Sequence, residues 1–464
     1  MPQGPDPGNA RTLDEFIGEL RLLKVWAGGP SITEITRRVH QDWRRAGRPR
    51  TEWPARSTVG NCFRPGRRRP NSDLLLAVVR ALAGGDEATV ALWRQALRTV
   101  LGEAEAAARV RACGRLPAGP SPLLGRSRAA SAAEAALTAA GQPGVVVLEG
   151  AAGVGKTSLA LHVARGVAAR SAADAPVLFA RLRGFDPTGP ATDPAAVLET
   201  FLRLLGVAGD RIPYGVTARA AVYRQLLAGT GALVVLDDAA DAEQVRPLLP
   251  GDPACRTLVT SRRMMRGLPG ATRLTLEPLA PDDSVALLRQ TAGAGPRSAD
   301  TAALRRIADD LGHLPSALTL IGRHMRQHTG WTLADYHRET VVPLALEEGV
   351  RAAIAASDAR TAPGARTLLR LLALHPLDRT DTARAAALAG EDEQAVRGHL
   401  DALCAAHLLT EPEPGRFRMP ALVRAYAEER VGLDVPGTAI RQALRRVPAP
   451  TEPAGAAAAR VLAA

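Results

Sequence analysis

Glycine, lysine and threonine occur between residues 150 and 158 with the spacing of a phosphate-binding loop. The pattern G-x-x-x-x-G-K-[ST] runs from Gly150 to Thr157 and follows the apolar run 145–148. Glycines let backbone N–H groups converge on phosphate oxygens, and a helix predicted over residues 159–169 adds its dipole. We expect Lys156 to reach the β- and γ-phosphates of a nucleotide and Thr157 to hold Mg²⁺. The expected nucleotide-binding residues of this loop are Gly150, Gly153, Val154, Gly155, Lys156, Thr157 and Ser158.

Two carboxylates and an arginine form the second candidate group. The apolar run 231–236 ends in Asp237 and Asp238, and it predicts a buried parallel strand with both acids at its carboxyl end. We expect Asp237 to support Mg²⁺ and Asp238 to orient or deprotonate the attacking water. A further predicted strand, 256–261, ends at Arg262, where a guanidinium can sense the γ-phosphate. The alternative for Arg262 is a surface position in an arginine-rich chain.

The predicted elements around these motifs alternate between strand and helix. A strand is expected over residues 176–181, and helices over 129–140, 197–205 and 219–228. This alternation is typical of an α/β domain with a parallel sheet. Further helices are expected over residues 282–291, 298–325, 350–358, 366–374 and 392–407. Two short strands around Gly415 follow the last of them and predict a winged helix.

The N-terminal hundred residues predict several short helices and carry most of the net positive charge. Eleven arginines lie between Ile35 and Pro70, and only Asp42 and Glu52 oppose them. Phosphate contacts supply most non-specific DNA affinity, and arginine suits them. The alternative is a solvated basic face in a chain in which arginine replaces lysine almost everywhere. The eleven are Arg37, Arg38, Arg44, Arg45, Arg48, Arg50, Arg56, Arg64, Arg67, Arg68 and Arg69.

Composition excludes several classes of protein. The chain has 464 residues, too many for one core, and a formal net charge of +12 that suggests an acidic partner such as nucleic acid. The four scattered cysteines form no C-x-x-C pair, so neither a zinc site nor a disulfide framework is predicted. The N-terminus has no signal pattern, and no apolar run is as long as a membrane span. We therefore expect a cytoplasmic protein.

The N-terminal pattern resembles the helix-turn-helix of the Xre (phage-repressor-like) family. The resemblance lies in Phe16 and Leu20-Arg21-Leu22-Leu23, in Ser31 to Ile35, and in Arg56-Ser57-Thr58-Val59. It implies that the helix starting near Ser57 enters the major groove of DNA. One departure is the length of chain, residues 41–55, between the two central helices, where a short turn is usual. The implied DNA-binding residues are Arg56, Ser57, Thr58, Asn61, Arg64, Arg67 and Arg68.

The middle of the chain, about residues 122–430, resembles the NB-ARC class of STAND signal-transduction NTPases in its bacterial regulator form. The resemblance implies ATP and ADP as ligands, Pro315 packed against the adenine, Arg262 as sensor, and Arg126 near the nucleotide. The motifs that carry it, beyond the phosphate loop, are Leu124-Gly125-Arg126, Arg183-Gly184-Phe185-Asp186, Leu236-Asp237-Asp238, Leu248-Leu249-Pro250-Gly251, Val259-Thr260-Ser261-Arg262 and Leu314-Pro315-Ser316-Ala317-Leu318.

Four positions in three motifs depart from the NB-ARC pattern. Ser127 stands where the family has Glu, and His313 where it has Gly. The family's Met-His-Asp, whose histidine binds the ADP β-phosphate, is here Met419-Pro420-Ala421. We therefore predict an ADP-bound off state that is weakened or built from other residues. Such proteins usually carry a repeat array, and no repeat of 20–50 residues follows residue 430. The chain is therefore expected to be either a naturally short form or one that receives its signal from a partner.

These observations predict a multidomain chain with an α/β P-loop NTPase and helical domains. The expected parts are a disordered N-terminus (1–11), a helical Xre-like helix-turn-helix domain (12–116), a linker (117–122), a P-loop nucleotide-binding domain (123–278), a helical lid (279–345), a winged helix (346–432) and a weakly ordered tail (433–464). The predicted function is an ATP/ADP-switched, DNA-binding transcriptional regulator with slow ATPase activity and a homo-oligomeric ATP state. One alternative is an interaction scaffold whose N-terminal helices bind protein. Another is a constitutive AAA-like ATPase.

Overall fold

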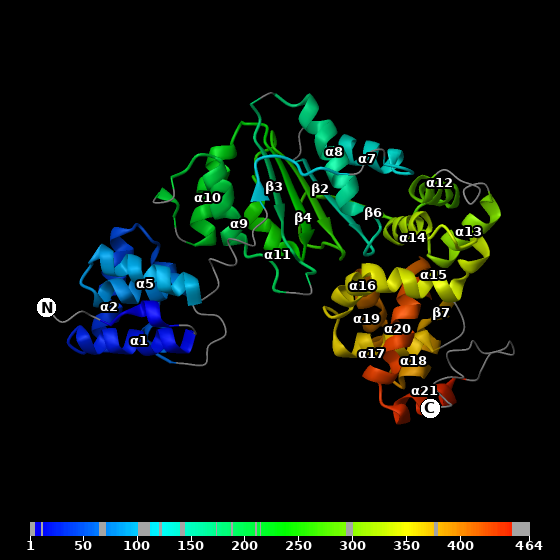
Figure 1. The fold of residues 1–464 in the computed structure, drawn as a ribbon. Coiled ribbons are helices and arrows are strands. Elements are labelled where there is room, and N and C mark those ends of the chain that lie inside the picture. Colours follow the sequence, from blue (N-terminus) through cyan, green and yellow to red (C-terminus); the bar gives the residue numbers. More distant parts are fainter. Residues whose placement is uncertain are drawn as a thin grey trace. The chain divides into compact units, whose positions relative to one another are not determined.

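The structure is a computed structural model with two compact units, each described here by itself (Figure 1). The first consists of Met1–Arg111 with Asp193–Val222, and the second of Ala112–Thr192 with Tyr223–Ala464. The structure describes residues 5–10, 13–64, 71–100, 112–119, 123–139, 144–172, 174–186, 189–208, 211–213, 215–293, 300–374 and 379–447.

The first unit is a helical bundle around one apolar core. Phe16 on the first helix lies edge-on to Trp93 on the fifth, with ring centroids 5.2 Å apart, and both rings are buried. The helices of this bundle are α1 (Leu13–Trp26), α2 (Ile32–Arg45), α3 (Arg56–Asn61), α4 (Ser72–Leu82) and α5 (Glu87–Val100), and the unit also includes α9 (Pro194–Leu204) and the first turns of α10 (Val216–Leu227). A short 3-10 turn, η1 (Pro7–Asn9), packs on α5, so part of the N-terminus expected to be disordered is folded.

Helix α2 is longer than the sequence analysis predicted. Ser31 caps it by accepting a hydrogen bond from the backbone N–H of Glu34, as expected. The helix then continues to Arg45, because Trp43 extends the buried stripe of Ile35 and Val39 at a spacing of four residues. The expected separation of residues 41–55 between α2 and α3 is therefore shortened to 46–55, which includes the 3-10 turn η2 (Arg50–Glu52).

A six-stranded sheet forms the centre of the second unit. Its order is β1-β3-β4-β5-β2-β6, and all neighbouring pairs are parallel except β1 with β3. Helices α7 (Ser127–Thr138) and α8 (Lys156–Arg170) pack against it. The strands are β1 (Ala112–Cys113), β2 (Gly144–Gly150), β3 (Val177–Arg181), β4 (Leu233–Ala239), β5 (Arg256–Ser261) and β6 (Thr272–Leu276). The α/β fold class is thereby confirmed.

Two edge strands were absent from the prediction. β1 pairs antiparallel with β3, so Ala112 and Cys113 belong to the sheet and not to the N-terminal helical domain that was expected to reach residue 116. β6 pairs parallel with β2, and its burial pattern is mostly exposed, which gives it little of the apolar signal that marks the central strands.

The rest of the second unit is mainly helical. The expected long helix 298–325 is broken in two, because Gly312 (φ +62°) and Pro315 end α13 and begin α14. The expected weakly ordered tail contains α21, whose Ile440 and Ala443 are buried. The helices are α11 (Ala242–Val245), α12 (Pro281–Ala292), α13 (Thr301–Asp310), α14 (Pro315–Gln327), α15 (Arg338–Ala345), α16 (Arg351–Asp358), α17 (Pro363–Ala373), α18 (Thr382–Ala389), α19 (Glu393–Ala405), α20 (Ala421–Asp434) and α21 (Gly437–Arg446).

A second sheet of three short strands completes this region. β7 (Arg379–Asp381) and β8 (Thr410–Glu413) each pair antiparallel with β9 (Arg416–Arg418). The helix α19 followed by this hairpin is the arrangement expected for a winged helix. In the described ranges of both units, none of the helices has the length and the apolar character that crossing a membrane requires.

Candidate nucleotide-binding site

The phosphate loop lies between β2 and α8, and two of its glycines are required by the backbone. Gly153 and Gly155 have φ angles of +79° and +99°, which side-chain-bearing residues rarely adopt. A Cβ on Gly153 would stand 2.1 Å from the Ser316 hydroxyl oxygen, so the start of α14 lies directly on the loop. The Ser316 backbone N–H also donates to the Gly153 carbonyl at 3.2 Å. The loop is therefore covered by the first turn of α14 in addition to its connections to β2 and α8.

Lys156 is the buried cation of the loop. Its Nζ donates to the carbonyl oxygens of Gly150 and Ala151, both at 2.8 Å. Burial, together with the positive charge of Arg262, lowers the pKa of Lys156 to about 7. An anion in the loop would reverse this effect, because an adjacent negative charge favours the ammonium form.

Thr157 and Asp237 meet at the carboxyl end of the sheet. The Thr157 hydroxyl donates to Asp237 Oδ1 at 2.6 Å, and the Thr260 hydroxyl donates to the same oxygen at 2.8 Å. Asp237 is only 1% exposed, so its carboxylate is fixed by these two donors. A hydroxyl and a carboxylate beside a phosphate loop are the oxygen ligands that Mg²⁺ prefers. The donor set thus fits the cation that the sequence predicts at Thr157 and Asp237.

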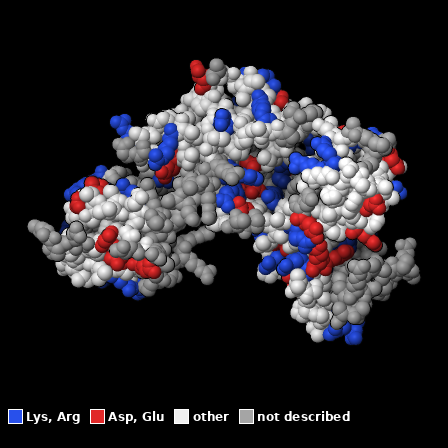
Figure 2. Space-filling view, in the orientation of Figure 1, with Lys and Arg blue, Asp and Glu red and all other residues white. Residues whose placement is uncertain are grey.

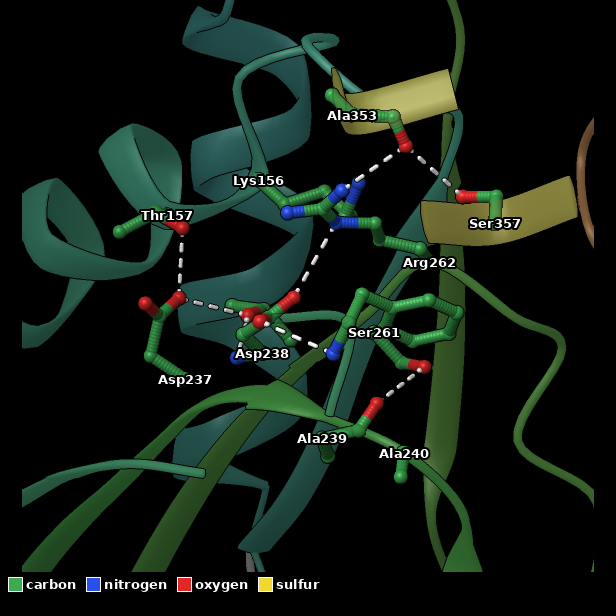
Figure 3. A network of polar contacts seen from close by, with 12 residues as sticks. Lys156, Thr157, Asp237, Asp238, Ala239, Ala240, Ser261, Arg262, Ala353 and Ser357 are labelled. Carbon is green, nitrogen blue, oxygen red and sulfur yellow. Dashed lines mark hydrogen bonds and ion pairs between the residues drawn. The ribbon is translucent and has the colours of Figure 1, made fainter. Parts of the chain in front are cut away.

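Asp238 and Arg262 form an ion pair at the carboxyl ends of the central strands β4 and β5 (Figure 3). Arg262 Nε lies 3.2 Å from Asp238 Oδ1, and Arg262 Nη1 donates to the Ala353 carbonyl at 3.1 Å. Ala353 belongs to α16, so one guanidinium joins β5 to the first helix of the expected winged-helix region. Asp238 has a φ of +59°. Its carboxylate points toward Arg262, whereas the carboxylate of Asp237 points toward Thr157 (Figure 3).

A cavity of about 900 Å³ encloses these groups. It is lined by the polar side chains of Lys156, Thr157, Asp238 and Arg262, and by apolar side chains of α12, α14 and the segment before α7. Pro315, which the family resemblance places against the adenine, lines this cavity. The apolar lining was not predicted, because single leucines in helices and connectors are common in any packed protein and do not indicate a binding site. The missed lining residues include the apolar Leu123, Leu124, Leu279, Leu287 and Leu320 and the polar Arg181, Thr319 and Arg323.

Arg126 lines the cavity but its hydrogen bonds go to the protein. Its guanidinium donates to the Val154 carbonyl at 2.9 Å and to the Glu277 carbonyl at 2.8 Å. The side chain is buried, and burial lowers its pKa. Arg126 thus ties the phosphate loop to the end of β6, and it holds the loop in place in addition to lying beside the cavity.

His407 is a second buried basic group that the sequence analysis did not place at the site. It follows α19 with a φ of +53°, and in the described part of the chain its Nε2 atom has no hydrogen-bond partner. Burial first, and the charge of Lys156 second, lower the pKa of His407 to about 4. Pro420, which stands where the family has its phosphate-binding histidine, caps α20 and is not among the residues that line the cavity.

The expected DNA-binding residues lie in the other unit. Arg56, Ser57 and Thr58 are exposed at the beginning of α3, Arg64 is exposed just after it, and Asn61 is half-buried. Arg67 and Arg68 lie outside the described residues. On the face drawn in Figure 2, acidic and basic side chains are interspersed, so the net charge is not gathered into one continuous basic surface there.

Two curated regulatory proteins are similar to part of this chain. The regulatory protein AfsR of Streptomyces coelicolor is 37% identical over 290 residues, which cover 61% of this chain and 29% of the relative; AfsR of Streptomyces griseus is 36% identical over the same lengths. The chain has the fold of an α/β P-loop NTPase, and the matched stretch is similar to part of these regulatory proteins. The chain spans less than a third of the length of these curated relatives. No family model matches.

Solved structures with detectable likeness to this chain include two ATPases. A STAND protein with a tetratricopeptide repeat sensor from Pyrococcus horikoshii is 20% identical, with a TM-score of 0.34, and covers 71% of this chain and 48% of that chain. A Walker-type ATPase of Pyrococcus abyssi is 13% identical, with a TM-score of 0.45, and covers 68% of this chain and 98% of that chain.

Proposed function

We propose that this protein is a signal-transduction NTPase that uses ATP and ADP to control DNA binding by its N-terminal helices. In this proposal the ATP state is a homo-oligomer, ATP hydrolysis is slow and resets the switch, and an unidentified protein or ligand supplies the signal. The regulatory AfsR relatives support a regulator, and the phosphate loop supports nucleotide binding. The proposed nucleotide switch is argued from the contacts of Arg262.

The observation that carries the switch is the position of Arg262. Its guanidinium is shared between Asp238, which stands at the end of β4, and the Ala353 carbonyl of α16. A γ-phosphate beside Lys156 is a stronger partner for a guanidinium than a neutral carbonyl, because both groups are charged. Arg262 is therefore expected to leave Ala353 when ATP binds, which releases one contact between the nucleotide-binding domain and α16.

The other groups divide the work of binding and hydrolysis. Lys156 and the loop N–H groups bind phosphate oxygens, and Thr157 with Asp237 holds Mg²⁺, which neutralises charge on those oxygens when it is bound. Asp238 accepts the proton of the attacking water once Arg262 has moved to the phosphate. The apolar lining of the cavity, with Pro315, is suited to the base. Nucleotides shift an equilibrium only through different affinities for its two states, and Arg262 supplies that difference.

The ADP state is expected to lack the usual histidine lock. Pro420 has no donor to offer a β-phosphate, because its ring nitrogen carries no hydrogen. ADP should therefore dissociate readily during purification. Tight ADP retention that is lost on substitution of Met419 would contradict this expectation.

The experiment that tests the switch compares Arg262→Ala with Arg263→Ala, an exposed neighbour. In wild type, ATP is expected to increase hydrogen exchange in α16, and ADP is not. Arg262→Ala should show high exchange in α16 without nucleotide, bind ADP within about threefold of wild type, and lose roughly tenfold of its preference for ATP. Arg263→Ala should behave as wild type. Equal exchange of α16 in the ATP and ADP states of wild type would refute the switch.

DNA binding is tested by measuring affinity at several salt concentrations with no nucleotide, with ADP and with ATP. Salt-sensitive binding that changes with nucleotide in wild type, but not in Lys156→Ala, would support the proposed regulator.

One observation favours a second function for the N-terminal helices, the binding of protein. Leu22, Val25 and Trp26 lie on one face of α1 and are 55%, 72% and 54% exposed. Exposed apolar stripes of this kind are typical of protein interfaces. An absence of DNA binding in every nucleotide state, with nucleotide binding intact, would favour this scaffold function.

A further inference from the structure

The connector between α2 and α3, residues 46–55, is a fixed part of the N-terminal fold. The indole Nε1 of Trp53 donates to the Arg48 carbonyl at 3.2 Å, and His40 Nε2 lies 2.9 Å from the carbonyl of the buried Pro54. The rings of His40 and Trp53 lie 5.0 Å apart. Arg48 lies over the Trp43 ring at 4.4 Å and pairs with Asp73 at 3.1 Å. These contacts fix the connector at both of its ends.

Two arginines flank the Trp53 ring on the outside of this connector. The guanidinium carbons of Arg44 and Arg50 lie 5.9 and 5.7 Å from the ring centroid. Both side chains are exposed, and within the described residues neither forms an ion pair. Other arginines of the same stretch differ, because Arg37 and Arg38 both pair with Glu34. We call Arg44, Arg50 and Trp53 the arginine–tryptophan cluster.

Cations held over an indole lose part of their conformational freedom before they bind an anion. Two such guanidinium groups on one ring present ten N–H donors in forks that match phosphate oxygens. Neither guanidinium pairs with a carboxylate in the described part of the protein. The cluster is followed within five residues by Arg56, Ser57 and Thr58 of α3, which are exposed. An extended row of regularly spaced phosphates beside α3 complements this arrangement better than a single anion does.

We propose that the arginine–tryptophan cluster binds the sugar–phosphate backbone of double-stranded DNA beside the site that α3 contacts. This inference rests on the proposed DNA-binding function. It gives a role to the long connector, which is the feature that departs from the usual helix-turn-helix. The contact is independent of base sequence, because phosphates carry no sequence information.

The test is the salt dependence of DNA affinity in the full chain, measured by fluorescence anisotropy with a random-sequence duplex and with any preferred duplex. Each phosphate contact contributes about 0.9 to the slope of log affinity against log salt concentration. The double variant Arg44→Gln/Arg50→Gln should therefore lower the slope by about 1.8 for both duplexes. The control Arg37→Gln/Arg38→Gln removes the same charge from arginines paired with Glu34, and it should leave the slope unchanged.

The outcomes separate this inference from the proposed function. Wild-type protein that binds no DNA overturns the proposed function and the cluster with it. Wild-type binding with an unchanged slope in Arg44→Gln/Arg50→Gln overturns only the cluster. An equal loss of slope in the control also overturns it, because the effect is then one of net charge alone. A far-ultraviolet circular-dichroism spectrum and a melting temperature that match wild type show that each variant is folded.

Discussion

The candidate nucleotide site and the arginine–tryptophan cluster use positive charge in opposite ways. Lys156, Arg126 and Arg262 are buried or half-buried, and each makes specified hydrogen bonds to carbonyl or carboxylate oxygens. Arg44 and Arg50 are exposed and rest on an aromatic ring. Buried charges are strongly coupled to their surroundings, whereas exposed charges are screened by salt. The two regions should therefore respond differently to salt, to pH and to substitution.

The largest expected effect comes from removal of the buried cation. Lys156→Ala should weaken binding of ATP and ADP by more than about 100-fold, because a charge-assisted contact in a desolvated site is lost. The affinity is measured by titration calorimetry. The nucleotide-free variant should keep the wild-type salt slope for DNA, since Lys156 belongs to the other unit.

Lys24→Ala is the matched control, because these are the two lysines of the chain. It should bind nucleotide as wild type does. A Lys156→Ala protein with unchanged nucleotide affinity would break the contrast, since the phosphate loop would then not be the binding site.

The buried His407 predicts how the free energy of unfolding depends on pH. Its pKa is about 4 in the folded state and about 6.5 in the unfolded state, so the unfolded chain binds more protons between these values. Stability contributed by neutral His407 is therefore present above pH 6.5 and is lost as the pH falls toward 4. Between pH 7.5 and 5 this loss amounts to about 2 kcal/mol.

Urea unfolding of wild type and His407→Gln at these two pH values measures the difference. The variant should lose less stability on acidification, whereas His337→Gln, an exposed residue, should follow wild type. Identical pH dependence in wild type and His407→Gln would show that His407 does not stay neutral in the folded protein.

The sequence predicted the polar half of the nucleotide site because its chemistry depends on local motifs. The pattern Gly150 to Thr157 and the pair Asp237-Asp238 each lie at the carboxyl end of one strand. Residues that are close together in the sequence are therefore also close together in the site. Arg262 was predicted for the same reason. What could not be predicted is its bond to Ala353, because 91 residues separate them and a backbone carbonyl has no sequence signature.

The errors have the same physical origin. α2 was predicted too short because Arg44 and Arg45 hide the continuation of its stripe at Trp43, and α21 was missed because alanine and arginine dominate a helix with only two buried residues. The edge strands β1 and β6 are fixed by pairing with β3 and β2, and not by their own apolar pattern. Tertiary pairing decides such segments, and it is invisible to a local reading of the sequence.

The smallest effect separates the two regions by pH. The pKa of Lys156 is about 7, whereas arginines stay charged throughout the accessible range. A phosphate binds the ammonium form, so nucleotide affinity should be constant below pH 7 and should fall by about tenfold from pH 7 to pH 8.5, with uptake of a proton on binding. DNA affinity at fixed salt should not change over this interval. Calorimetry in buffers of different ionisation enthalpy detects the proton. A nucleotide affinity that is flat to pH 8.5 would mean that Lys156 is fully charged before the ligand arrives, and then its burial does not set the pH response of the switch.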